Sequence, residues 1–282
     1  MHMPPDWLQG LFAVLPTPMV SGGGLDLDGL DRVVEHYLDG GAAGLVPASI
    51  AGEGDLLDDA ERRAVIQRVV RRAAGRAPVA VGVLDERTDR ALAQARVAAG
   101  CGAGALLVKP PRGDAQQILA HVGAIALAMR MPIVLLDHPK FGGRLPLSLL
   151  QVLVNGVPEI VGIKVEDEPT ADKMARLRTL LGSRLRLFGG LGGVHCLHEL
   201  EHGADGFFTG YPHPRALVDV MDCWRRGERA AAVAANARML PVALREQADP
   251  DTMILQRKTL LRDAGVLREA VVRPRPPARW PA

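Results

Sequence analysis

One lysine at the end of an apolar run offers the clearest chemistry in this sequence. The run Val161-Gly-Ile-Lys164 is apolar and partly β-branched, and the acidic residues Glu166 and Asp167 follow it closely. A lysine at the last inward position of a buried strand loses hydration, which disfavours the ammonium and leaves a nucleophilic amine. Such an amine can form a Schiff base with a carbonyl substrate. The alternative is a surface lysine just past a strand end, with Glu166 and Asp167 pairing with nearby arginines.

The segments on both sides of this lysine alternate between short apolar runs and longer amphipathic ones. Strands are expected at residues 10–15, 44–48, 78–83, 104–109, 132–136, 160–164, 185–188 and 205–209. Helices are expected at residues 26–38, 58–74, 88–99, 116–129, 147–154, 170–181, 194–202 and 215–226. Strand–helix repeats at a spacing of roughly 25 to 30 residues are typical of a (β/α)8 barrel, the TIM barrel. The strands are apolar throughout, as parallel strands covered on both faces should be.

A doubly wound sheet is the alternative α/β architecture. It needs a glycine-rich phosphate turn after its first strand, where this chain has Pro16-Thr-Pro18. We therefore expect residues 1–226 to form the barrel and residues 227–282 to form a C-terminal helical extension. The extension should hold helices over 229–248 and 252–264, followed by an extended proline-rich tail from Arg273.

Composition argues against several classes of partner. The chain has 282 residues, 48% of them hydrophobic, and a formal net charge of +2. This charge gives no reason to expect nucleic acid or a membrane as partner, and no run of about 18 apolar residues is present to cross a bilayer. Cys101, Cys196 and Cys223 are scattered, so we expect reduced thiols in a cytoplasmic protein. The start, Met1 to Pro5, has no signal-peptide core.

In a (β/α)8 barrel the chemistry lies at the C-terminal ends of the strands. These ends carry lysines, carboxylates and small residues: Ser49, Ile50, Ala51 and Glu53 after the second strand, Lys109 after the fourth, Asp137 and His138 after the fifth, Lys164 and Glu166 after the sixth, Gly189 and Gly190 after the seventh, and Thr209 after the eighth. The glycines allow backbone N–H groups to approach a ligand closely. We expect an anionic substrate in this pocket.

Several of these segments resemble one enzyme family. The chain is similar to the dihydrodipicolinate synthase / N-acetylneuraminate lyase family of class I aldolases in Phe12–Pro18, Gly52-Glu53, Pro132–Pro139, Gly162-Ile-Lys164 and Gly203–Gly206. The resemblance implies a (β/α)8 barrel with a C-terminal extension, assembly as a homo-oligomer (dimer or tetramer), and no cofactor. It also implies that Lys164 forms a Schiff base with pyruvate or a related 2-oxo acid.

The chain departs from the family pattern at the residues that handle protons. Ile50 and Ala51 stand where the family usually has two threonines, and Leu136 stands where it has a tyrosine. That tyrosine shuttles a proton in the carbon–carbon bond step, and leucine can neither donate nor accept one. Synthase activity of the diaminopimelate pathway is therefore not expected. Asp137 is the first replacement to consider as acid/base, although strand alternation turns it away from the face of Leu136; His138 is the second.

The remaining candidates are expected to bind substrate. Ser49, with the backbone N–H groups of Ile50 and Ala51, should hold the substrate carboxylate. Lys109 would either help to keep the neighbouring amine uncharged or hold a substrate carboxylate or phosphate, and its alternative is a solvated strand end. Gly189 and Thr209 complete the expected binding residues.

Three functional hypotheses follow. The first is a cofactor-free lyase or aldolase that makes or breaks a carbon–carbon bond of a small 2-oxo acid through Lys164, with or without an aldehyde co-substrate. A dehydratase or hydratase that uses the same iminium is a variant of it. The second is a barrel that binds a carbonyl metabolite without catalysis. The third is a metal-dependent lyase. His195, His198 and His202 recur at helical spacing and could form a metal-binding face. Their helix should lie on the barrel's outer wall, however, which favours a solvated or interface face.

Overall fold

The computed structural model of the chain describes residues 3–142, 144–247 and 252–274. Its strands are β1 Gly10–Val14, β2 Gly44–Val46, β3 Ala80–Val83, β4 Ala105–Val108, β5 Ile133–Asp137, β6 Ile160–Val165, β7 Arg186–Gly189 and β8 Gly206–Thr209. Its helices are α1 Leu27–Asp39, α2 Asp59–Ala73, α3 Thr88–Gly100, α4 Ala115–Met129, α5 Leu147–Gly156, α6 Thr170–Leu181, α7 Cys196–Glu201, α8 Pro214–Arg225, α9 Arg229–Gln247 and α10 Met253–Asp263. Short 3-10 turns are η1 Ile50–Gly52, η2 Gly182–Arg184 and η3 Leu191–Gly193. None of the helices in the described ranges is long and apolar enough to cross a membrane.

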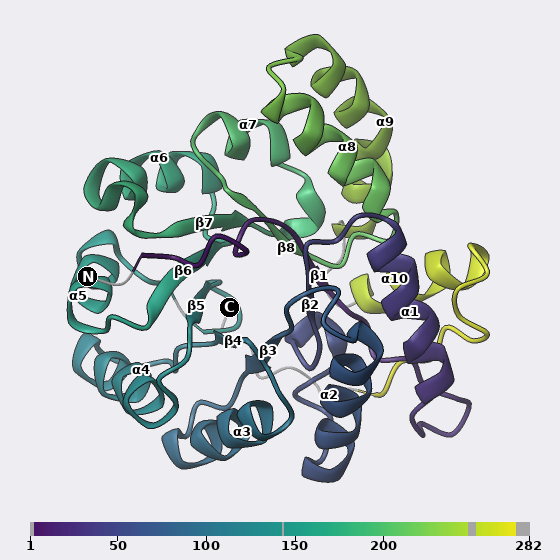
Figure 1. The fold of residues 1–282 in the computed structure, drawn as a ribbon, viewed down its shortest axis with the longest axis horizontal. Helices are drawn as coiled ribbons and strands as arrows, with labels where there is room; N and C mark the ends of the chain where they lie inside the picture. The colour runs from purple at the N-terminus through teal and green to yellow at the C-terminus, as the bar shows by residue number, and fades with distance from the viewer. Residues whose placement is uncertain (1–2, 143, 248–251, 275–282) are drawn as a thin grey trace.

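The strands form a ring with the helices around the outside (Figure 1). All strand pairs are parallel, in the order β2-β1-β8-β7-β6-β5-β4-β3. A parallel bridge between Leu45 and Val79 brings the two outer strands of that order, β2 and β3, next to each other. The predicted (β/α)8 barrel is therefore confirmed. Because the strands run in parallel, their C-terminal ends gather at one mouth of the barrel, where this fold carries its chemistry.

Aromatic and aliphatic side chains fill the barrel interior. Phe12 of β1 stacks on Phe208 of β8 with their ring centroids 4.7 Å apart, and Phe188 of β7 lies edge-on to Phe208. Gly44 of β2 leaves room for this stack, because a Cβ there would lie 2.2 Å from the Phe12 ring. Leu136 of β5 belongs to the same cluster. The strand face that carries Leu136 is therefore the inner one.

The observed elements follow the predicted ones closely, and the main difference comes after β7. The sequence predicts a helix over residues 194–202, whereas the structure has η3 followed by the shorter α7. Gly192 and Gly193 have positive φ angles of 66° and 79°, a conformation that glycine adopts readily and that interrupts a regular helix. The chain therefore makes a tight turn at the barrel mouth before α7 begins.

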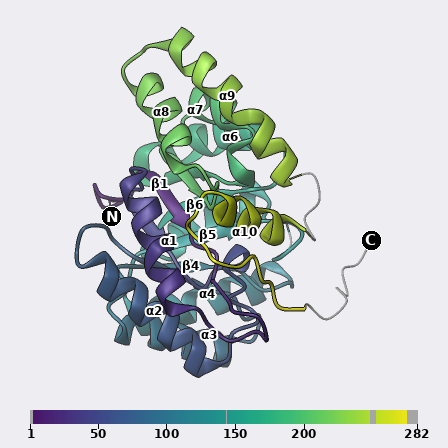
Figure 2. The ribbon, with the colours of Figure 1, turned by 90° about the vertical axis from the view of Figure 1, so that its right-hand side faces the viewer.

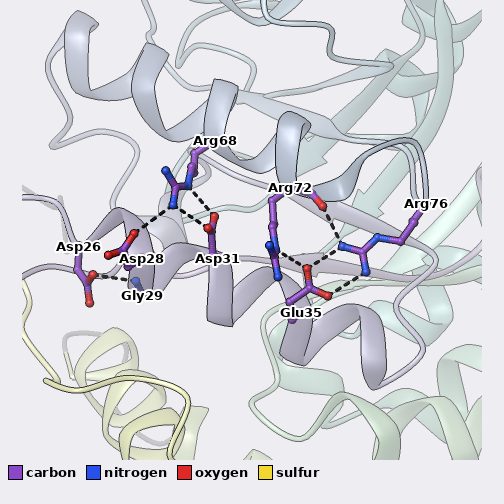
Figure 3. A network of polar contacts seen from close by, with 8 residues as sticks. All are labelled: Asp26, Asp28, Gly29, Asp31, Glu35, Arg68, Arg72 and Arg76. Atoms are coloured by element: carbon purple, nitrogen blue, oxygen red, sulfur yellow. Dashed lines mark hydrogen bonds and ion pairs between the residues drawn. The ribbon is translucent and has the colours of Figure 1, made fainter.

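Charged side chains join α1 to α2 on the outside of the barrel (Figure 3). Arg68 of α2 binds both oxygens of Asp31, each at 2.7 Å, and Arg76 binds both oxygens of Glu35 at 2.8 and 2.7 Å. The Arg68 and Arg76 side chains stay partly exposed in these pairs, at 29% and 47%. Exposed pairs of this kind contribute about 0 to 1 kcal/mol each, so the apolar layer beneath them dominates the stability of this wall.

The C-terminal extension packs on two sides of the barrel (Figures 1 and 2). Helix α9 lies along α8, and α10 lies beside α1. Buried charges hold α10 in place: Lys258 pairs with Glu53, and Arg257 pairs with Glu246 of α9. The predicted proline-rich tail begins at Arg273, which pairs with Glu61; from position 275 the tail lies outside the described residues.

Candidate active site

Lys164 is positioned inside the barrel mouth by the alternation of strand β6. Its Cα is in register with Leu136 of β5 and Phe188 of β7, and both of these side chains belong to the interior cluster. Side chains on neighbouring parallel strands at the same register share a face. The Lys164 side chain therefore points into the barrel, where it is 11% exposed. The alternative of a solvated strand-end lysine does not hold.

Glu166 is the acid beside this lysine. Its Oε2 lies 3.0 Å from Lys164 Nζ, and its Oε1 accepts a 2.9 Å hydrogen bond from the Leu191 N–H of η3. A Cβ on Gly190 would lie 2.0 Å from Oε1, so the turn can approach only because that residue is glycine. Burial opposes ionisation of Glu166, but Lys164, His138 and the Leu191 N–H together lower its pKa below the ordinary value. Glu166 is therefore an ionised carboxylate held in a fixed position.

His138 follows the end of β5 and faces the same site. Its Nδ1 accepts a 3.2 Å hydrogen bond from the Lys140 N–H, and the edge of the Phe141 ring packs against it at 4.5 Å between centroids. Burial lowers the pKa of His138, the charge of Lys164 lowers it further, and Glu166 opposes both. Because Nδ1 is an acceptor, the neutral ring carries its proton on Nε2. This leaves one N–H donor for a ligand.

The structure does not bring Asp137 to Lys164. Asp137 is in register with Val165, which packs in the layer between strands and helices. Its carboxylate is fully buried and lies 2.6 Å from Lys173 Nζ of α6. Burial raises the pKa of Asp137 to about 6, and the charge of Lys173 opposes that rise. The Asp137 side chain therefore points away from the barrel interior, as the two-residue alternation of the strand predicts.

The turn after β2 lies over the barrel interior. Ser49 is buried, and its carbonyl accepts 2.9 Å hydrogen bonds from the N–H groups of Gly52 and Gly54. Ile50 and Ala51 pack against the interior cluster. These three expected carboxylate-binding residues are therefore together at the mouth of the barrel.

The other expected binding residues are engaged elsewhere. Lys109 Nζ donates to Glu86 Oε1 at 2.8 Å and to the Phe141 carbonyl at 3.1 Å. Gly189 faces the outer layer, since a Cβ there would lie 2.2 Å from Glu199 Oε2. Thr209 follows Phe208, which points into the interior, so alternation turns the Thr209 side chain outward. Gly189 and Thr209 therefore face away from Lys164, whereas Lys109 begins on the inner face of the barrel, two residues after the interior Leu107, and its ammonium is held by Glu86.

A comparison of this chain with known proteins gives its family. The model of the Dihydrodipicolinate synthetase family matches residues 7–279. The chain belongs to that family. It is similar to 4-hydroxy-tetrahydrodipicolinate synthase from Methylococcus capsulatus, with 31% identity over 97% of this chain and 93% of the relative. It is also similar to L-2-keto-3-deoxyarabonate dehydratase from Azospirillum brasilense, with 29% identity over 95% of this chain and 88% of the relative.

Solved structures agree with this family. The dihydrodipicolinate synthase of Rhodopseudomonas palustris superposes with a TM-score of 0.89 and 30% identity, covering 95% of this chain and 91% of that one. YagE from E. coli K12, solved with pyruvate, shares the fold with a TM-score of 0.88 at 22% identity over 96% and 92% of the two chains. Members of the dihydrodipicolinate synthetase family are class I aldolases and lyases, so the predicted enzyme class is confirmed at the level of the family.

The sequence analysis did not identify Glu166 as the partner of Lys164. Pairing of Glu166 and Asp167 with nearby arginines was the alternative to a role in the pocket; Asp167 lies 3.2 Å from Arg144, whereas Glu166 pairs with Lys164. The signal was present, because residues two apart on a strand share a face. Among the described residues, no group of three or more His, Cys, Asp or Glu side chains is arranged to hold a metal ion. His195, on the expected outer wall, instead pairs with Glu168 at 2.8 Å.

Proposed function

We propose that the chain is a Schiff-base-forming lyase that acts on a small, pyruvate-like 2-oxo acid through Lys164. The ion pair of Lys164 with Glu166 inside the barrel mouth, 3.0 Å between Nζ and Oε2, carries this proposal. An amine attacks a keto group in its free form, and an adjacent carboxylate can take the proton that it sheds. The same carboxylate then stabilises the cationic iminium.

The neighbouring residues supply the other parts of the reaction. The substrate carboxylate would lie at the turn of Ser49, Ile50 and Ala51, whose backbone N–H groups are suited to an anion. The iminium acidifies the hydrogens on C3 of the substrate, and Glu166, beside Nζ, can move a proton there. His138 would serve an oxygen on C4 through its Nε2–H. Assembly as a homo-oligomer and a cytoplasmic location stay predictions from the sequence.

A dehydratase that uses the same iminium is the second candidate function. The observation in its favour is that a fixed, ionised carboxylate stands next to Nζ, while Leu136 occupies the inward position at the end of β5. Glu166 would take a proton from C3 to form an enamine. The C4–O bond would then break, with His138 giving its proton to the departing hydroxyl, which leaves as water. The similarity to a 2-keto-3-deoxy acid dehydratase adds support.

Reduction with borohydride tests the first proposal. The protein is incubated with pyruvate or with other 2-oxo acids, reduced, and its intact mass is measured alongside that of Lys164→Ala and of a sample treated with a chelator. We expect a covalent adduct that is absent from Lys164→Ala and unaffected by the chelator. A folded wild-type protein that gives no adduct with any 2-oxo acid would contradict the proposal.

The products separate the two reactions. A 2-keto-3-deoxy sugar acid split between C3 and C4 gives pyruvate and an aldehyde, whereas its dehydration gives water and a single dioxo acid of unchanged carbon number. Nuclear magnetic resonance of the reaction mixture distinguishes these products directly. Pyruvate among the products supports the carbon–carbon lyase, and the dioxo acid alone supports the dehydratase.

A further inference from the structure

Glu199 of α7 is a carboxyl group in the interior of the protein, and no cation pairs with it in the described part of the chain. Its side chain is 0% exposed. The buried hydroxyl of Thr170, at the start of α6, is the polar group beside it. A buried ionised carboxylate without a partner is costly, whereas the uncharged acid is tolerated far better.

Glu199 and Glu166 lie on opposite sides of one short turn. A Cβ on Gly189 would lie 2.2 Å from Glu199 Oε2, whereas a Cβ on the next residue, Gly190, would lie 2.0 Å from Glu166 Oε1. The residue after these, Leu191, donates its N–H to Glu166 at 2.9 Å. The backbone that fixes Glu166 beside the reactive lysine is therefore packed directly against Glu199.

We propose that Glu199 is a positioning residue that supports catalysis only in its uncharged form. As an acid it packs behind Gly189 and keeps the turn in place for the hydrogen bond from Leu191 to Glu166. When Glu199 loses its proton, two carboxylates face each other across the turn. The turn then shifts, and the contact of Glu166 with Lys164 weakens. This inference rests on the proposed function of the Lys164 site.

Among the described residues that shift the pKa of Glu199, none is a cation that could stabilise its ionised form. Burial raises its pKa to about 8, the Thr170 hydroxyl opposes that rise, and the charges of Glu166, just after β6, and Glu168, in the loop before α6, add to it. Cys196, on the same helix, is itself influenced by Glu199: burial raises the pKa of its thiol to about 12, and the carboxylate adds to that rise. Glu168 is in turn paired with His195 at 2.8 Å.

The pH dependence of Schiff-base trapping tests this inference. Rates of borohydride trapping with pyruvate are measured from pH 6 to 9.5 for the wild type, Glu199→Gln and Glu201→Gln. Glutamine keeps the shape of the uncharged acid and cannot ionise, and Glu201 is an exposed residue of the same helix that serves as a matched control. Relative to Glu199→Gln, we expect the wild-type rate to be about tenfold lower at pH 9 than at pH 7. Glu201→Gln should follow the wild type.

Two results would overturn the inference. One is the same alkaline decline in Glu199→Gln as in the wild type; the other is a folded Glu199→Gln that traps no pyruvate at any pH, which would mean that the carboxylate itself is needed. Thermal unfolding distinguishes either result from failure of the proposed function. If the wild type traps nothing, it should still lose stability between pH 6 and pH 8 relative to Glu199→Gln, because over that range the unfolded chain has released the Glu199 proton while the folded protein retains it; equal losses overturn the inference.

Discussion

Two lysine–carboxylate pairs lie at the same rim of the barrel and differ in what surrounds them. Lys164, on the inner side of β6, lies 3.0 Å from Glu166, which directly follows that strand. Lys173 reaches Asp137 on the outer side of β5 at 2.6 Å. The two lysine side chains are almost equally buried, at 11% and 10% exposure. Burial alone therefore does not make one of them reactive.

The number of acceptors around each ammonium separates the two pairs. Lys173 meets Asp137, Asp167 at 3.0 Å and the Leu145 carbonyl at 2.8 Å, so all three of its protons have acceptors. In the described part of the chain, Lys164 pairs with Glu166 alone. Lys173, with an acceptor for each of its protons, ties α6 and the loop before α5 to the strands. Lys164, at the barrel mouth, still has hydrogen-bonding capacity for a substrate.

Lys164→Ala should have the largest effect on turnover. Removing the nucleophile removes the covalent route, and we expect turnover to fall by at least about a thousandfold. Steady-state assays with a 2-oxo acid substrate measure this, and an unchanged circular dichroism spectrum serves as the control for folding. A variant that retains more than a tenth of the wild-type activity would mean that the inner lysine is not the reactive one.

Glu166→Gln tests whether the partner of the inner lysine does more than pair with it. Glutamine fills the same space and can still accept the Leu191 N–H, but it cannot take a proton. We expect turnover to fall by about 10² to 10⁴, as is typical for loss of a general acid–base group. Trapping of an adduct at Lys164 should persist, more slowly. Activity within twofold of the wild type would reduce Glu166 to a structural partner.

His138→Gln should have a smaller effect at the same site. We expect turnover to fall by roughly ten- to a hundredfold, because a departing oxygen loses its proton donor while the Schiff base still forms. Measuring trapping and turnover on the same sample separates these steps. Equal losses in both measurements would place His138 in substrate binding and not in proton transfer.

Lys173→Met should affect stability and leave turnover nearly unchanged below the melting temperature. It leaves the Asp137 carboxylate buried without its cation, a change that costs about 3 to 5 kcal/mol. Burial already raises the pKa of Asp137 to about 6, so the loss should be smaller at pH 5, where the group is protonated, and larger at pH 8. Denaturant unfolding of Lys173→Met and of Lys173→Met with Asp137→Leu checks this. The double variant should recover most of the loss, and a failure to do so would contradict the pairing.

The barrel and the place of the reactive lysine follow from local patterns in the sequence. Strand and helix periodicities predict the (β/α)8 fold, and the resemblance of Gly162-Ile-Lys164 to the family motif predicts the Schiff-base role. The two-residue strand period also predicts that Asp137 points to the opposite face from Leu136. Applied to Glu166, the same period would have paired it with Lys164.

Contacts between distant segments could not be predicted in this way. Asp137 finds Lys173 on α6, and Glu199 of α7 packs against Gly189; both contacts depend on how helices dock on the barrel. Gly189 and Gly190 face different glutamates although they are adjacent. A one-residue uncertainty at a strand end therefore exchanges the inner and outer faces.

Peptide mapping of the borohydride-reduced adduct tests the central claim most directly. The wild-type protein is reduced in the presence of pyruvate or the best 2-oxo acid, digested, and every lysine-containing peptide is analysed by mass spectrometry. We predict a single modified residue, Lys164, with Lys173 and Lys109 unmodified. An adduct on Lys173 or Lys109 with Lys164 left free would contradict the assignment of the inner pair as the reactive one.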